Sequence, residues 1–147
     1  MKISVRNAQD NLRINAAFIK HMIRDVLKEE RITRDGEIAL CVTDDRKIRG
    51  LNKTYLGKNR PTDVIAFNLS ENEAKLHGDI IVSAETARAY SRKFHTEPAY
   101  ELYLYVIHGV LHLLGYDDRT KKQRAKMHRR ELELLRKFRY YRLSLER

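Results

Sequence analysis

The sequence contains few of the residue types that cross-link or interrupt a small protein: one cysteine, two prolines and no tryptophan among 147 residues. The single Cys41 excludes a disulfide framework and a multi-cysteine zinc ribbon, and it favours a reducing compartment. No apolar run approaches the roughly 20 residues of a membrane span. Because Met1-Lys2-Ile3-Ser4 leads into polar sequence with no apolar stretch, we expect no signal peptide. We therefore expect a cytoplasmic protein that contacts no membrane.

The length and composition also limit the number of domains. A chain of 147 residues is within the range of one domain, and a hydrophobic content of 42% is too high for a disordered protein. No repeat, low-complexity tract or linker divides the chain. We expect residues 1–147 to form a single domain.

The positive charge is concentrated at the C-terminal end. The net charge is +10, and residues 119–147 contain twelve Lys or Arg against three Glu, while residues 1–118 are nearly neutral. The spacing of apolar residues predicts a helix from about Arg119 whose inner face is formed by Ala125, His128, Leu132, Leu135 and Phe138. Two interpretations of this basic helix remain open: a solvated surface, or a contact with nucleic acid phosphates.

Strands and helices are mixed along the chain rather than strictly alternating. Alternation or continuous apolar character predicts strands at residues 2–7, 37–43, 64–69 and 78–83. Helix-capping residues precede the expected helices at Asn15, Asp44 and Thr96. A further helix is expected to start at Ser83 or Ala84 and to run to about Phe94. Residues 70–76 are polar and are expected to form a hairpin connection. The pattern predicts an α+β fold in which a small mixed sheet packs among about five helices.

The most apolar segment, residues 97–114, is expected to be a buried central helix. His108 and His112 lie four residues apart on it, so both imidazoles project from one face. Neutral imidazoles at this spacing suit a divalent metal, whereas a lone buried histidine is usually a hydrogen-bonded core residue. Gly109 lies between them and costs a helix about 1 kcal/mol relative to Ala. Its presence predicts close approach of another backbone or of a substrate.

A third metal ligand can come from the residues after this helix. Gly115 is expected to end the helix and turn the chain, which allows either Asp117 or Asp118 to approach the histidines. Three protein ligands with an open fourth position are typical of catalytic metal sites. A peptidase is disfavoured because Gly109 stands where such enzymes carry their general-base Glu. A non-haem iron site is disfavoured because no jelly-roll pattern is present.

Residues 108–118, HGVLHLLGYDD, resemble the signature of the YbeY family, His-Gly-x-Leu-His-Leu-x-Gly-Tyr-Asp-His. The resemblance spans about residues 36–135 in the same order. Supporting matches are Leu51, Asn52, Tyr55, Pro61-Thr62-Asp63-Val64, Gly78-Asp79-Ile80, Met127 and Glu131. The resemblance implies an α+β fold and a metal-dependent, single-strand-specific endoribonuclease. It further implies a role in ribosomal RNA maturation, including 3′-end processing, and in ribosome quality control, with the small ribosomal subunit as a candidate partner.

The resemblance also implies the site residues. One divalent metal ion, zinc by analogy, would be held by His108, His112 and Asp118, and the last replaces the histidine usual in the family. Leu56 stands where the family usually has Arg, and Lys58 and Arg60 are near enough in the sequence to supply the missing cation to a phosphate.

No general base is identified with the same specificity. Asp63 and Asp79 are candidates only by residue type, and their ordinary roles are in a turn and at a strand start. Two other functions remain open. One is a non-catalytic ribosome- or RNA-binding factor with a structural metal, and the other is a metal-dependent hydrolase of a different substrate.

Overall fold

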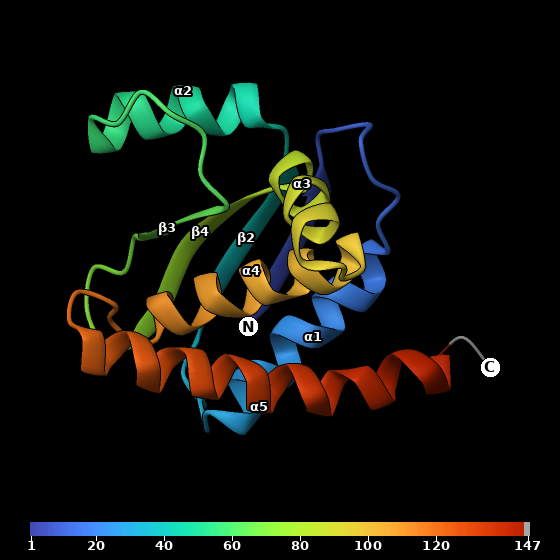
Figure 1. The fold of residues 1–147 in the computed structure, drawn as a ribbon. Coiled ribbons are helices and arrows are strands. Elements are labelled where there is room, and N and C mark those ends of the chain that lie inside the picture. Colours follow the sequence, from blue (N-terminus) through green and yellow to red (C-terminus); the bar gives the residue numbers. More distant parts are fainter. Residues whose placement is uncertain (146–147) are drawn as a thin grey trace.

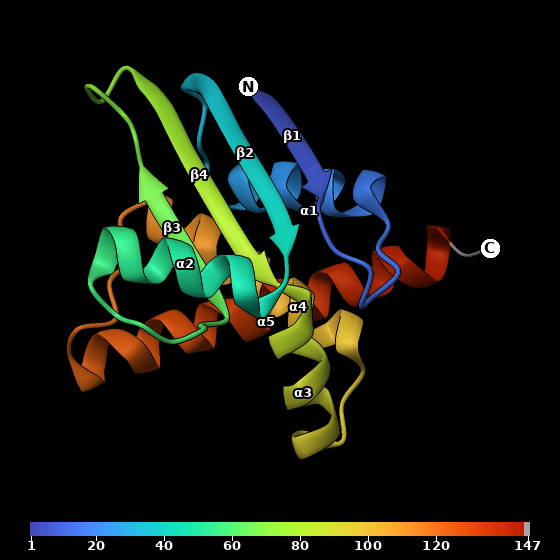
Figure 2. The same ribbon diagram turned by 90° about the horizontal axis from the view of Figure 1, so that it is seen from above.

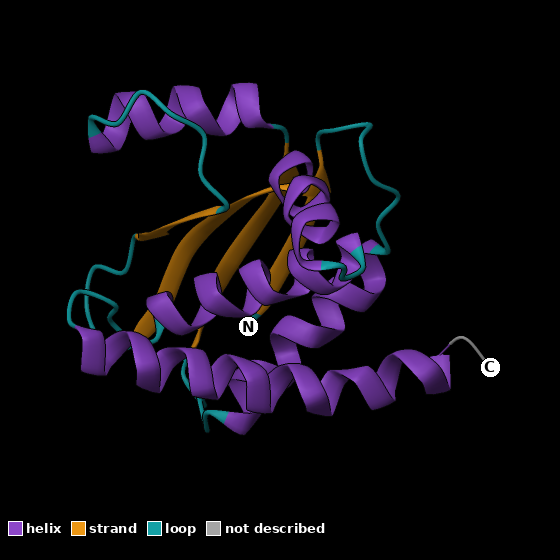
Figure 3. Cartoon of the chain, viewed as in Figure 1, coloured by secondary structure: helices purple, strands orange, loops and turns teal. Residues whose placement is uncertain are grey.

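The computed structural model describes residues 1–145, with side chains through Phe138. Four strands and five helices occur in this part of the chain. Their bounds are β1 Lys2–Asn7, α1 Ala16–Glu29, β2 Asp35–Thr43, α2 Asp45–Leu56, β3 Val64–Asn68, β4 Lys75–Ser83, α3 Ala84–Phe94, α4 Pro98–Leu113 and α5 Lys121–Leu145. Figure 3 shows how helices and strands are distributed along the fold.

The four strands form one mixed sheet in the order β1-β2-β4-β3. Strands β1, β2 and β4 are parallel, and β3 runs antiparallel to β4. Helices α1 and α4 cover one face of the sheet, α5 packs against α1 and α4 on that side, and α2 lies on the other face (Figures 1 and 2). The α+β prediction is therefore confirmed.

The core lies between the sheet and the three helices on its covered face. Side chains on a strand alternate between the two faces, and every second residue of the central strands is buried: Ile38, Leu40 and Val42 on β2, and Leu76, Ile80 and Val82 on β4. Helix α1 adds Phe18, Ile19, Met22, Ile23, Val26 and Leu27. Among the helices within residues 1–145, none has the length and hydropathy that crossing a bilayer requires.

Two predicted helix caps, Asn15 and Asp44, are confirmed, and one, Thr96, is wrong. The Asn15 side chain accepts a hydrogen bond from the Phe18 amide, and Asp44 and Ser83 cap α2 and α3 in the same way. Thr96 does not cap α4. Its hydroxyl instead donates to the Glu101 carboxylate at 2.7 Å, and Glu97 occupies the cap position without a side-chain cap bond. Pro98 in the first turn lacks an amide hydrogen and so needs no cap partner.

The expected hairpin connection is shorter than predicted, because residues 75–77 belong to β4. They pair with Asp35–Glu37 of β2 in parallel register. Polar residues can extend a strand when a neighbouring strand supplies hydrogen bonds to their backbone, and local periodicity does not contain that information.

The buried face of α5 also differs from the prediction. Ala125 and His128 are exposed. Between Lys121 and Phe138, the part of this helix whose side chains are described, the buried residues are Met127, Glu131, Leu134, Leu135 and Phe138. The helix is rotated relative to the predicted stripe because its inner face includes Glu131, a charged residue that a purely apolar pattern leaves out. The reason for its burial becomes clear at the site described below.

Gly109 lets α4 approach the sheet closely. A Cβ atom at this position would lie 2.6 Å from Ile80 Cγ2 and 3.3 Å from Val64 Cγ2. The expectation of a close neighbour is thus correct, but the neighbours are strand side chains rather than a backbone. Ile80 is fully buried, so it has no free space into which to move.

We predict that Gly109→Ala lowers the free energy of unfolding by about 1 kcal/mol or more, because overpacking costs about 1–3 kcal/mol and exceeds the gain in helix propensity. The matched control is Gly50→Ala in the exposed middle of α2, where nothing lies within 4 Å of the added Cβ. That variant should be stabilised by roughly 0.5–1 kcal/mol. Denaturant unfolding of both variants measures the difference. Equal effects would contradict the packing account.

Candidate metal centre

His108 and His112 lie side by side at the C-terminal half of α4. Their ring centroids are 4.7 Å apart, as the spacing of four residues requires. Their side chains retain 26% and 29% of their accessible surface, whereas the neighbouring Gly109 and Leu111 are buried. Helix α4 therefore packs its apolar residues against the sheet and presents both imidazoles at a partly open surface.

The chain turns back at the end of α4 as predicted. The amide of Gly115 donates to the His112 carbonyl and the amide of Tyr116 donates to the Leu111 carbonyl, both at 3.1 Å. Gly115 has φ +100°, a conformation that residues with a Cβ rarely adopt. This pair of bonds ends the helix and directs residues 117–120 back along the face that carries the histidines.

Asp118, rather than Asp117, faces the two imidazoles. Its Oδ2 lies 3.4 Å from His112 Nε2 and 3.7 Å from His108 Nε2. The Asp117 carboxylate instead accepts a hydrogen bond from the Asp118 amide at 2.8 Å and forms an ion pair with Arg119. The structure thus brings together His108, His112 and Asp118. Asp117, the other aspartate that the sequence allowed as a ligand, stabilises the turn instead.

The spacing of the three ligand atoms fits a bound divalent metal. One atom from each side chain lies within 4.8 Å of the other two. Ligand atoms at about 2.0–2.2 Å from a tetrahedral metal are separated from one another by about 3.3–3.6 Å. The two measured carboxylate-to-imidazole distances are close to that range. Two neutral imidazoles and one carboxylate are also a donor set that zinc and other divalent metals accept.

Glu131 of α5 fixes the orientation of the His108 ring. Its carboxylate, only 4% exposed, forms a hydrogen bond with His108 Nδ1. This bond leaves Nε2 directed at Asp118 and free to bind a metal, the arrangement in which an outer carboxylate sets the tautomer of a histidine ligand. Burial alone would lower the pKa of His108, but the hydrogen bond and charge of Glu131, with Asp63 and Asp118, raise it above its usual value.

A second polar cluster anchors the turn that carries Asp118. The Tyr116 hydroxyl donates to both carboxylate oxygens of Glu30, at 3.1 and 3.2 Å. Arg130 donates to the same carboxylate at 2.7 Å and also to Glu133 at 3.0 Å. Because Glu30 follows α1 and Arg130 lies on α5, these bonds tie the turn to two helices.

Of the two candidate general bases, Asp63 acts on the metal centre and Asp79 does not. Asp63 directly precedes β3, and its charge acts on His108. Its carboxylate accepts a hydrogen bond from the Val64 amide. Asp79 does not face the centre, because it alternates with buried Gly78 and Ile80 and so points to the opposite face of the sheet from α4.

Lys58 and Arg60 are exposed on the loop between α2 and β3. The buried Asn52 side chain donates to the Arg60 carbonyl, and the Lys58 amide donates to the Asn52 carbonyl. This loop therefore has a defined backbone, and it leads directly to Asp63.

Two residues at this site have roles that were not predicted. Glu131 bonds His108 from 23 residues further along the chain, and Glu30 holds the Tyr116 turn from 86 residues earlier. An acidic residue in a strongly basic helix is the one local signal that could have indicated Glu131. No comparable signal distinguishes Glu30 from the neighbouring Glu29.

Fold and site together define an α+β protein with a His-His-Asp group suited to a divalent metal. Residues 4–139 match the family described as Endoribonuclease YbeY. The chain is 36% identical over 144 residues to the endoribonuclease YbeY of Syntrophotalea carbinolica, covering 93% of this chain and 95% of the relative. It is 37% identical over 126 residues to that of Petrotoga mobilis, covering 86% and 87%. The chain belongs to the YbeY family.

A solved structure supports the same fold. The solution structure of TM1509 from Thermotoga maritima superposes with a TM-score of 0.59 and 23% sequence identity. The alignment covers 97% of this chain and 93% of that one. The architecture is therefore shared by two chains with little sequence in common.

We predict that Glu131→Ala lowers the free energy of unfolding by about 1–3 kcal/mol, because it leaves a partly buried His108 nitrogen without its partner. The matched control is Glu133→Ala on the same helix, whose side chain is 54% exposed and whose loss should cost less than about 0.5 kcal/mol. Thermal unfolding of both variants in the absence of metal tests this. Similar losses would show that Glu131 does not support His108.

Proposed function

We propose that this protein is a metal-dependent endoribonuclease that cleaves single-stranded RNA, acting in ribosomal RNA maturation, including 3′-end processing, and in ribosome quality control. The observation that carries the proposal is the position of Asp118, whose carboxylate lies 3.4 and 3.7 Å from the Nε2 atoms of His112 and His108. Membership of a family described as Endoribonuclease YbeY supports RNA as the substrate.

His108, His112 and Asp118 would hold one divalent ion, and we propose zinc. The choice of zinc rests on the two imidazole donors, which suit it well, and on the distances of 3.4 and 3.7 Å between the carboxylate and the imidazoles. Three protein ligands leave a position open for water or substrate, as in catalytic rather than structural zinc sites. When bound, such an ion supplies Lewis acidity that polarises water and the phosphoryl oxygens of a substrate.

The chain's own cations would bind and orient the RNA. Lys58 and Arg60 lie on a loop whose backbone is fixed by Asn52, so each can present a positive charge to a phosphate at low entropic cost. They would replace the arginine that the family usually carries at the position of Leu56. Charge developing on the scissile phosphate would be stabilised by the same side chains.

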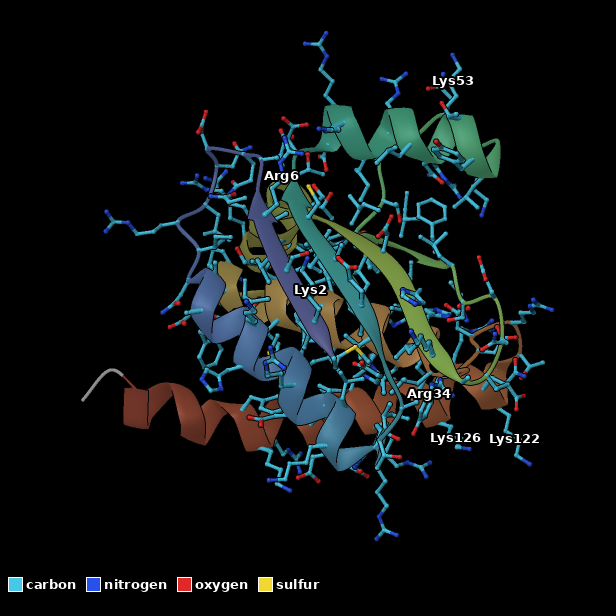
Figure 4. All side chains as sticks on the ribbon, turned by 180° about the vertical axis from the view of Figure 1, so that it is seen from behind. Lys2, Arg6, Arg34, Lys53, Lys122 and Lys126 are labelled. Carbon is cyan, nitrogen blue, oxygen red and sulfur yellow. The ribbon has the colours of Figure 1, made fainter. Side chains whose placement is uncertain are left out.

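Helix α5 would attract the RNA toward this centre. The helix begins three residues after Asp118, and Figure 4 shows Lys122 and Lys126 projecting outward from its first turns. A cluster of one sign of charge beside a site raises the local concentration of an oppositely charged substrate. We propose that residues 1–147 act as one domain with this basic C-terminal helix, in the cytoplasm and on the small ribosomal subunit.

A non-catalytic RNA-binding factor with a structural metal is the second candidate. The observation that favours it is Leu56, an exposed apolar side chain where the family usually has a catalytically relevant cation. Binding of RNA without cleavage by the metal-loaded protein would support this alternative.

We predict that His112→Ala and Asp118→Ala each abolish binding of one equivalent of zinc and reduce cleavage of single-stranded RNA by more than the roughly 10- to 100-fold that loss of an outer-shell partner causes. His21→Ala, at an exposed position of α1, is the matched control and should change neither. Metal content is measured by mass spectrometry and cleavage with nuclease-free preparations. Full metal content and full cleavage in Asp118→Ala would contradict the proposed site.

We predict that replacing Lys121, Lys122 and Lys126 with Gln weakens RNA binding and makes it less sensitive to salt, with unchanged zinc affinity. Each lost phosphate contact should reduce the slope of log affinity against log salt by about 0.7 for a single strand. The control replaces the exposed Arg13, Lys20 and Lys28 and tests the effect of net charge alone. Equal losses in the two triple variants would show that α5 has no special role.

A further inference from the structure

Helix α3 exposes two aromatic side chains that stack on each other. Tyr90 is 40% exposed and Phe94 56% exposed, although large aromatic residues are usually well buried. Their rings are nearly parallel, with an interplanar angle of 3° and centroids 5.7 Å apart. Lys93 places its ammonium 5.9 Å from the Tyr90 centroid and 5.5 Å from that of Phe94. An apolar ring surface and a positive charge thus occur together.

The helix that carries this pair is held firmly. Its opposite face is buried through Ala84, Ala87 and Ser91. The Ser91 carbonyl accepts a hydrogen bond from the Thr96 amide, and Arg88 donates to the Asn11 carbonyl at 2.6 Å. A rigid support means that the rings need no reorganisation before they bind a flat ligand.

The aromatic pair lies toward the other end of α4 from the candidate metal centre. Helix α3 ends at Phe94, shortly before α4 begins at Pro98, whereas His108 lies further along α4, after a rise of about 15 Å. Figure 1 shows α3 beside the start of α4, and the first turns of α5 beyond the other end of α4.

We infer that Tyr90, Phe94 and Lys93 form a stacking platform for one base of the single-stranded RNA, at a nucleotide several positions along the strand from the scissile phosphate. The inference rests on the proposed function and adds a base-binding subsite to it. Every nucleobase has a face that can stack on an aromatic ring, so such a platform holds single strands without selecting a sequence. A duplex keeps its bases stacked within the helix, and the platform therefore favours single-stranded substrates.

Charge favours RNA over a protein partner at this surface. Helix α3 carries Arg88, Arg92 and Lys93 against one acidic residue, Glu85. A positive, aromatic surface matches a polyanion with exposed bases. The two rings, four residues apart, could instead serve only to stabilise the helix slightly. In that case, substituting them would change the stability of the protein but not its preference for RNA that carries a base at one position.

The test combines variants of the platform with removal of single bases from the RNA. Affinity is measured by fluorescence anisotropy with metal-free protein, so that the RNA stays intact, and with oligonucleotides that carry one abasic site at successive positions. The variants are Tyr90→Leu and Phe94→Leu, which keep apolar bulk and helix propensity but lose the ring. The matched controls, Tyr90→Phe and Phe94→Tyr, keep it.

For the wild-type protein we expect one abasic position to weaken binding by about 5- to 150-fold. Each Leu variant should bind intact RNA more weakly and lose little more affinity when that base is absent, while the control variants behave as the wild type. The platform would be overturned if a Leu substitution and the missing base each weakened binding by the same factor in combination as they do separately. It would also be overturned if the wild-type protein bound all abasic RNAs with equal affinity. RNA cleavage by metal-loaded wild-type protein is measured separately, because its absence would overturn the proposed function itself.

Discussion

The close contact between α4 and the sheet is the constraint on which the site depends. Helix α4 has to bury an apolar surface while it holds two polar imidazoles at a partly open face. Gly109 makes this possible, because the missing Cβ lets Ile80 and Val64 approach the helix between the two histidines. Packing therefore fixes the height and rotation of α4, and these set the direction of both rings. The Gly115 turn then needs only a few residues to bring Asp118 to them.

The polar side of the same contact determines how α5 packs. His108 Nδ1 is partly buried and needs a partner, which Glu131 supplies. That bond rotates α5 so that Glu131 faces inward with Met127 and Leu134, and the lysines of the first turns remain in solvent. One histidine thus links the packing of α4, the rotation of α5 and the exposure of the basic surface that we assign to RNA.

Much of this fold could be predicted from local sequence signals. Periodicity located the helices and most strands, and Asn15, Asp44 and Ser83 marked helix starts because their side chains cap the next amides. The histidine pair and the glycine turn could also be predicted from local signals. Three features could not be predicted in this way. Residues 75–77 form strand only because β2 pairs with them, and Thr96 is diverted from capping by Glu101. Glu131 is buried by a histidine 23 residues earlier in the chain.

The central claim is that His108, His112 and Asp118 bind one divalent metal ion in the protein that cuts RNA. The most direct measurement is anomalous diffraction from crystals of the zinc-loaded protein. The account predicts one anomalous peak at about 2.0–2.2 Å from Nε2 of each histidine and from a carboxylate oxygen of Asp118. A peak elsewhere, or saturating zinc with no peak between these three side chains, would contradict it.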